Sequence, residues 1–152
     1  MANVVNLLRN LKNWVYFRVL MEFKKRGSLY RPQEITNINC NCRIAKPIYK
    51  YNDKYYVDLE LTPETTRRVE ELHRNSENLM VKKNKKIPLE GTKLKVKVPF
   101  RYNKVTCKMP GNKSVHELLQ GDRARVNLEY CGVWTVGDYC GVSWKLSLIQ
   151  EV

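Results

Sequence analysis

The feature that most constrains the fold is a strict alternation of apolar and polar residues near the end of the sequence. From Arg123 to Tyr130, apolar side chains occupy every second position, and charged or amide side chains occupy the positions between them. This period of two is typical of a β-strand with one buried face. The alternation resumes from Val142 to Leu148, after a segment that contains Gly137 and Asp138. We therefore predict a long antiparallel hairpin that can help to close a small barrel.

Two glycines interrupt the predicted hairpin at positions that lie near each other across it, Gly132 and Gly141. A missing side chain in a strand permits a bulge, a sharp coil or the close approach of another backbone. We expect at least one of these at each glycine.

The end of the sequence resembles that of phage and viral OB-fold single-stranded DNA-binding proteins. The resemblance rests on Leu119-x-Gly121-Asp122-x-Ala124-x-Val126, an aromatic turn, Gly141-Val142-Ser143-x-x-Leu146 and Ile149-Gln150. It extends loosely over the sheet from Asn37 onward and does not include residues 1–35. It implies a β-barrel of the OB type that coats exposed strands during DNA replication or recombination. Many such proteins end in an acidic tail that recruits replication partners, whereas this sequence ends at Gln150-Glu151-Val152.

Two more strands and one helix are predicted upstream of this region. Residues 37–46 alternate, and a second alternating run follows a turn at Asn52-Asp53, which is the expected start of an OB-type meander. Thr62-Pro63-Glu64 combines a capping hydroxyl, a proline at the first helical position and an acid near the positive helix end. We predict a mainly β domain (β-barrel, OB-fold) over residues 36–152, with one inserted helix on which His73 is a solvated surface histidine.

Residues 1–35 are predicted to form a basic amphipathic extension. Their first half places apolar residues at helical spacing, with Arg9, Lys12 and Arg18 before any acid. Three roles stay open for this N-terminal helix: packing or partner contact, organelle targeting, and a dispensable leader before Met21.

Positive charge is concentrated in two segments. The formal net charge of the chain is +13. Residues 82–108 contain ten lysines or arginines and one acidic residue, and residues 1–35 contain seven lysines or arginines and two acidic residues. Such a charge favours polyanionic partners, nucleic acid first and an anionic membrane surface second. No apolar run is long enough to span a membrane.

Within the basic segment, a predicted strand over residues 93–98 separates its charge from its apolar face. Lys93, Lys95 and Lys97 share one face, at a spacing of about 6.6 to 6.8 Å. That spacing is close to the phosphate repeat of an extended single strand. The alternative is that these lysines protect an exposed sheet edge against aggregation.

A single-stranded nucleic acid requires basic groups for its phosphates and flat side chains for its bases, which contribute about 1 to 3 kcal/mol each. Tyr55 and Trp144 fall on predicted core faces, and Tyr49 and Tyr51 are weaker candidates than the aromatic residues at outward or loop positions. The predicted nucleic-acid-binding residues are Lys93, Lys95, Lys97, Arg101, Tyr102, Lys104, Arg123, Arg125, Trp134, Tyr139 and Tyr56.

Signatures of enzymes and metal sites are missing from the sequence. It contains neither Gly-x-x-x-x-Gly-Lys nor His-Glu-x-x-His, and no clustered acids, so we predict no enzyme activity, cofactor or metal. Five cysteines, an odd number without a secretory signal, favour an intracellular reducing compartment, which for a viral protein is the host cytoplasm or nucleus. Cys40 and Cys42 are interpreted as buried free thiols.

The sequence therefore predicts a binding protein for single-stranded DNA. RNA as a ligand, replication proteins as partners and a homo-oligomer are left open. The alternative is a basic viral structural or assembly protein that uses charge and the N-terminal helix to bind nucleic acid or a protein partner. Such a protein would bind duplex and single strands alike.

Overall fold

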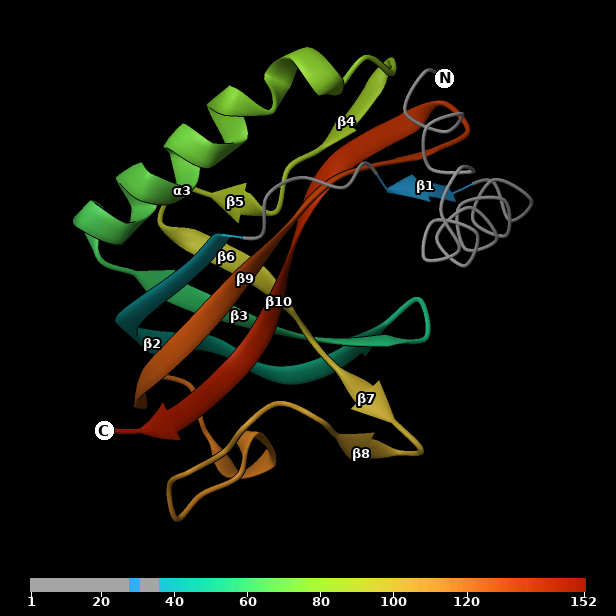
Figure 1. Ribbon diagram of the computed structural model, residues 1–152. Coiled ribbons are helices and arrows are strands. Elements are labelled where there is room, and N and C mark those ends of the chain that lie inside the picture. The colour runs from blue at the N-terminus through green and yellow to red at the C-terminus, as the bar shows by residue number, and fades with distance from the viewer. Residues whose placement is uncertain (1–27, 31–35) are drawn as a thin grey trace, which may run out of the picture.

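The computed structural model describes residues 28–30 and 36–152; the amphipathic helix expected near the N-terminus lies outside these residues. The described chain is mainly β and contains one α-helix (Figure 1). Its elements are β1 (Ser28–Tyr30), β2 (Thr36–Tyr51), β3 (Lys54–Leu61), α3 (Pro63–Asn75), η1 (Glu77–Leu79), β4 (Asn84–Lys86), β5 (Leu89–Glu90), β6 (Lys93–Val98), β7 (Phe100–Arg101), β8 (Lys104–Val105), η2 (Val115–Glu117), β9 (Arg123–Val136) and β10 (Tyr139–Glu151). None of the helices among these residues is long and apolar enough to cross a bilayer.

One sheet joins most of the strands in the order β1-β9-β2-β3-β6-β10-β4, and β9 also pairs with β10. The pairings β9–β2, β2–β3, β3–β6 and β9–β10 are antiparallel. In contrast, β6 and β10 are parallel and meet at one registered pair, Lys97 opposite Lys145. Strand β5 pairs with β6, and β7 and β8 form a small hairpin of their own. The pairings therefore follow a closed order, from β9 through β2, β3, β6 and β10 back to β9.

The long hairpin predicted from the alternation is confirmed. Strands β9 and β10 pair from Val136 opposite Tyr139 to Ala124 opposite Glu151. The register shifts where Ser143 faces Gly132 and Trp144 faces Tyr130, which leaves Cys131 as an extra residue. Gly132 has a φ of 89°, a conformation that favours glycine in a bulge. The extra residue shifts the alternation of side chains by one position. The side chains of Tyr130 and Val133 therefore both point inward, and both are buried.

Gly141 is the point at which a second backbone approaches the hairpin. It pairs in parallel with Lys86 of β4 and in antiparallel register with Trp134 of β9. A Cβ atom at this position would collide with the backbone oxygen of Lys86 and would lie 2.9 Å from Cζ2 of Trp134. The expected close approach is therefore present at Gly141.

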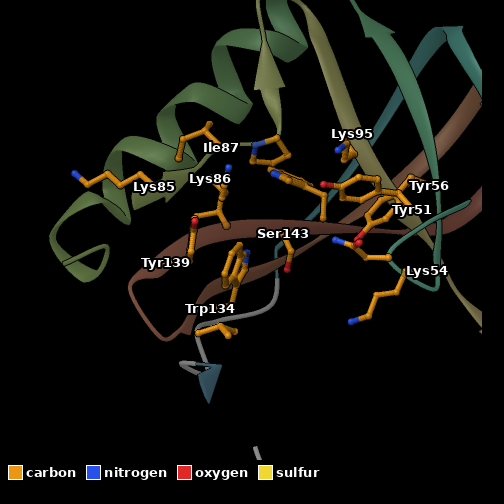
Figure 2. Close-up of a pocket in the computed structure, with 15 residues that line it drawn as sticks. Tyr51, Lys54, Tyr56, Lys85, Lys86, Ile87, Lys95, Trp134, Tyr139 and Ser143 are labelled. Atoms are coloured by element: carbon orange, nitrogen blue, oxygen red, sulfur yellow. The ribbon is translucent and has the colours of Figure 1, made fainter. Parts of the chain in front are cut away.

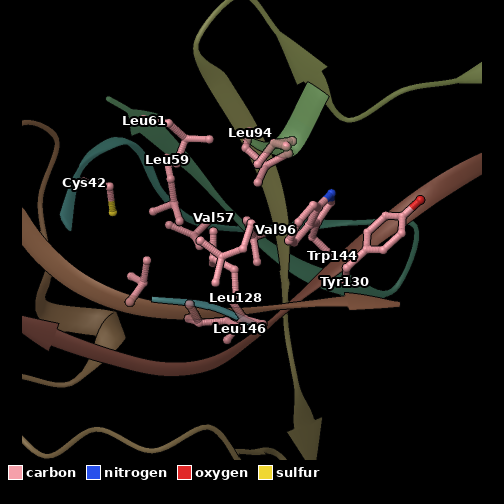
Figure 3. Packing of buried hydrophobic residues seen from close by; sticks show 14 of the residues in the cluster. Cys42, Val57, Leu59, Leu61, Leu94, Val96, Leu128, Tyr130, Trp144 and Leu146 are labelled. Carbon is pink, nitrogen blue, oxygen red and sulfur yellow. The ribbon is translucent and has the colours of Figure 1, made fainter. Parts of the chain in front are cut away.

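The core consists of the inward faces of β2, β3, β6, β9 and β10 (Figure 3). The apolar residues that alternate along β9 are buried as predicted, as is Trp144 on β10. Tyr55, also expected in the core, is half-buried and stacks on Phe100 with ring centroids 4.1 Å apart. Burial of these faces removes apolar area from water, at about 25 cal/mol per Å², and is the main force that holds the strands together.

Strand β2 is longer than predicted, because it continues through Pro47 to Tyr51. The register with β3 shifts on both sides of Lys46, next to this proline, which has no amide hydrogen to donate. The predicted turn follows, with Asn52 and Asp53 at φ values of 49° and 63°. Two such residues are typical of the tight turns that match the twist of a hairpin.

Helix α3 begins as predicted, with Pro63 in its first turn and a hydrogen bond of 3.2 Å from the Thr65 amide to Oγ1 of Thr62. The prediction of a surface histidine at position 73 is wrong. His73 is 7% exposed, and its Nε2 accepts a hydrogen bond of 2.9 Å from Nε1 of Trp144. His73 follows Val69 by four residues, so both lie on the helix face that packs against the sheet.

A second contact fixes the end of the same helix. The hydroxyl groups of Ser76 and Tyr130 lie 2.7 Å apart in a hydrogen bond, next to the pair formed by His73 and Trp144. Burial lowers the pKa of His73 to about 4, so the ring is neutral and its Nε2 can accept the indole hydrogen. These polar contacts tie α3 to both strands of the β9–β10 hairpin.

Candidate nucleic-acid interface

A groove of about 740 Å³ lies between the β2–β3 turn, strand β4 and the tip of the β9–β10 hairpin (Figure 2). Its lining is basic and aromatic, and none of the described residues that form it is acidic. The basic residues are Lys54, Lys85, Lys86 and Lys95, and the large aromatic residues near the opening are Tyr51, Tyr56, Trp134 and Tyr139.

One end of the groove is organised by the β2–β3 turn. The tight turn places Tyr51 directly opposite Lys54 in the ladder. From the neighbouring strand β6, Nζ of Lys95 lies 5.0 Å from the centre of the Tyr51 ring and 5.4 Å from that of Tyr56. The Tyr51 side chain is 56% exposed, so a ring held next to a cation remains open to a ligand.

The other end is organised by β4 and the β9–β10 turn. Because Gly141 has no side chain, the Trp134 ring can lie against β10 at the wall of the groove. Tyr139 is 45% exposed, and Nζ of Lys86 lies 5.5 Å from the centre of its ring. Each end thus pairs a lysine with an aromatic face (Figure 2).

This arrangement is suited to a polyanion that also carries flat groups. The attraction between a lysine ammonium group and an aromatic ring stabilises an exposed site by about 0.5 to 1 kcal/mol. A phosphate that binds can form an ion pair with the same ammonium group, while the ring remains free to stack. No acidic side chain among the described residues lines the groove, so the lining itself favours a phosphate backbone.

Four of the predicted binding residues meet in this groove: Tyr56, Lys95, Trp134 and Tyr139. They come from four different strands, β3, β6, β9 and β10. The structure brings them together because β3 borders β6, and β6 and β9 both border β10.

The other two lysines of the β6 face do not line the groove. Lys93 is exposed and lies opposite Glu60 in the ladder with β3. Lys97 is half-buried; burial first, and then the nearby Lys54 and Lys145, lower the pKa of Lys97. Lys145 itself forms an ion pair with Glu129 at 3.1 Å.

The alternative interpretation of the β6 lysines, protection of an exposed sheet edge, is wrong. Strand β6 pairs with β3 along one side and with β5 and β10 along the other. It is an interior strand, so its lysines do not serve to block pairing at an edge.

The predicted arginines of β9 lie far from the groove. Arg125 precedes Trp134 by nine residues, which corresponds to about 30 Å along a strand. Arg123 faces Arg43 across the β2–β9 ladder, and Arg43 donates a hydrogen bond of 3.3 Å to the backbone oxygen of Gly121. These arginines form a separate basic surface at the open end of the hairpin.

The remaining predicted residues lie on the β7–β8 hairpin, outside the groove lining. Arg101 and Lys104 face each other in its ladder. Tyr102 occupies its turn and is 86% exposed, with the Arg101 guanidinium carbon 5.5 Å from the ring centre.

Three lysines of the groove were missed from the sequence. Lys85 and Lys86 belong to the basic run from residue 82 to 86, which reads as a solvated loop. They form β4 because this segment pairs in parallel with β10, more than fifty residues later in the chain, and no local pattern indicates such a pairing. Lys54 could have been found, since it directly follows the predicted Asn52-Asp53 turn.

No metal centre is evident in the described part of the chain, where no three His, Cys, Asp or Glu side chains are grouped to hold an ion. The cysteines are free thiols. Burial raises the pKa of Cys42 to about 12 and that of Cys107 to about 11, so both remain protonated and unreactive at neutral pH.

Comparison with known proteins adds no assignment, because no protein-family model, curated protein or solved structure matches the chain.

Proposed function

We propose that this chain is a single-stranded DNA-binding protein with an OB-fold barrel, which coats exposed strands during DNA replication or recombination. The observation that carries the proposal is the groove, in which Lys54, Lys85, Lys86 and Lys95 are interleaved with exposed aromatic rings and no described acid intervenes. Basic grooves with stacking platforms are the common solution for binding single strands without sequence preference.

The strand order supports the OB-fold part of the proposal. An OB fold is a five-stranded, partly open Greek-key barrel, and the five strands β2, β3, β6, β9 and β10 pair in one closed order. OB folds bind oligonucleotides on the face of their second and third strands and with the loops after strands 1 and 4. The corresponding parts here are β3, β6, the β2–β3 turn and the β9–β10 turn, and the groove lies next to each of them.

The aromatic rings favour a single strand over a duplex as the ligand. In a duplex the bases stack on each other, so rings such as Tyr51 and Trp134 could not stack on them. Unpaired bases expose both faces and can stack at about 1 to 3 kcal/mol each.

The experiment that tests the proposal is fluorescence anisotropy with a labelled oligothymidylate and a matched duplex over a salt series. We expect strong preference for the single strand, with quenching of tryptophan fluorescence. Equal binding of both ligands that disappears with salt would contradict the proposal and favour a basic structural or assembly protein.

A matched pair of variants locates the site. Lys85→Gln/Lys86→Gln and Arg123→Gln/Arg125→Gln each remove two positive charges, the first inside the groove and the second at the far end of β9. We expect the groove variant to reduce the log-log salt slope by about 1.4, at about 0.7 per phosphate contact, and the β9 variant to leave it unchanged. Equal losses from both would show that net charge, and not the groove, determines affinity.

A further inference from the structure

The turn of the β7–β8 hairpin contains a tyrosine whose presence the stability of the hairpin does not explain. Tyr102 and Asn103 have φ values of 53° and 63°. Asparagine, aspartate and glycine adopt this conformation readily in two-residue turns, whereas a bulky side chain does so at a cost. Packing does not offset that cost, because Tyr102 is 86% exposed. A strained and exposed aromatic residue at a hairpin tip points to a role in binding.

The base of this hairpin is firmly attached to the rest of the molecule. The Phe100 ring stacks on Tyr55 of β3 at 4.1 Å and an interplanar angle of 27°, and His116 lies edge-on to it at 5.9 Å. The hairpin is closed at its base by a hydrogen bond of 2.9 Å from the Thr106 amide to the backbone oxygen of Pro99. The tip is therefore presented on a fixed support.

The support adjoins one end of the groove along β3 and β6. Tyr55 directly follows Lys54, which lines the groove, and Arg101 follows Lys95 by six residues, or about 20 Å of strand at most. The β2–β3 turn and the β7–β8 hairpin project toward the same side of the molecule (Figure 1). The hairpin segment is also basic, since residues 99–108 carry three positive side chains and no acid.

We propose that the β7–β8 hairpin is a second contact for the same nucleic-acid strand, reached when that strand extends beyond the groove past Lys54. The inference rests on the proposed function. In this arrangement Tyr102 stacks on a base, and Arg101 and Lys104 bind the phosphates on either side of it. The Arg101 guanidinium already lies 5.5 Å from the Tyr102 ring centre, so a cation and a stacking surface are presented together.

The test compares oligothymidylates of about 4 and about 12 nucleotides, which lie within the range of site sizes known for OB folds. The variant is Tyr102→Asn, because asparagine tolerates the positive φ and should keep or improve the stability of the hairpin. We expect affinity for the longer strand to fall about tenfold and affinity for the shorter strand to stay constant. Tyr102→Phe, which retains the ring, should bind both as the unaltered protein does.

The outcomes separate this inference from the proposed function. If Tyr102→Asn leaves both affinities unchanged, or lowers both equally, the hairpin is not an extension of the binding path and the inference fails. The proposed function then still stands, provided that Lys85→Gln/Lys86→Gln weakens binding of both lengths. If the groove variant has no effect on either length, the proposed function fails. Urea denaturation of Tyr102→Asn checks that a loss of affinity does not come from unfolding.

Discussion

At the scale of single residues, His73 makes stability depend on pH. Its pKa is about 4 in the folded protein, against about 6.5 for an exposed histidine, because burial penalises the charged ring. The unfolded chain therefore binds a proton at a higher pH than the folded chain does. The contribution of His73 to the free energy of unfolding is therefore complete above pH 6.5, and it is lost as the pH falls toward 4.

We expect the free energy of unfolding to fall by about 2 kcal/mol from this histidine between pH 7.5 and pH 5, a window in which most carboxylates stay ionised. Urea denaturation at several pH values in that window measures the change. His73→Gln retains an acceptor for the Trp144 indole and should flatten the profile, whereas His116→Gln, at an exposed position on η2, should not. A profile that stays steep in His73→Gln would show that other groups cause the dependence.

Gly141 is the second residue with a specific consequence. Gly141→Ala places a methyl group against the Lys86 backbone and the Trp134 ring, so that β4 or Trp134 must move. We expect a loss of about 1 to 3 kcal/mol in stability, typical of an overpacked site, together with weaker binding of single strands. Denaturation curves and anisotropy titrations measure the two effects.

Gly111→Ala is the matched control for that substitution. Gly111 also contacts β10, but an added Cβ would meet Cγ of Gln150 at 3.2 Å, on a flexible side chain at the far end of the strand. This variant should bind single strands normally. If it weakens binding as much as Gly141→Ala does, close packing of β4 on β10 is not what shapes the groove.

At the scale of elements, β6 has lysines in three different environments on one face. Lys95 lines the groove, Lys97 is half-buried and Lys93 is exposed opposite Glu60. Replacing all three with glutamine should reduce the salt slope by less than the value of about 2.1 that three phosphate contacts would give. Lys95→Gln should account for most of the reduction, and Lys93→Gln for little. Titrations of the three single variants over a salt series measure the contribution of each lysine. Equal contributions would contradict this assignment.

Local elements were largely predictable from the sequence, because their signals are local. The alternation in β3, β6 and β9, the Asn52-Asp53 turn and the Thr62 cap each follow from a few neighbouring residues. Apart from Lys54, the residues missed are those whose placement depends on distant parts of the chain. Lys85 and Lys86 form a strand because β10 is present beside them, and His73 is buried because Trp144 and Tyr130 pack against α3.

At the scale of the whole molecule, binding should stabilise the entire fold, because the groove joins segments from most of the described chain. A ligand present at one hundred times its dissociation constant adds about 2.7 kcal/mol to the free energy of unfolding. For a domain of this size, that corresponds to a rise in Tm of about 5 to 10 °C. Thermal denaturation with an excess of a long oligothymidylate measures the shift, which should shrink in Lys85→Gln/Lys86→Gln at the same ligand concentration. An equal shift in that variant would contradict the placement of the ligand.

The position of β10 late in the sequence has a consequence for how the chain folds during synthesis. During synthesis β4 and β6 leave the ribosome well before β10, the strand with which both form parallel pairs. Parallel partners so distant in sequence are slow to meet, because a long loop must close first. We therefore expect the groove to form late in folding, because Tyr139, Val142, Ser143 and Trp144 of its lining lie on β10. A nascent chain that lacks these residues therefore lacks one wall of the groove.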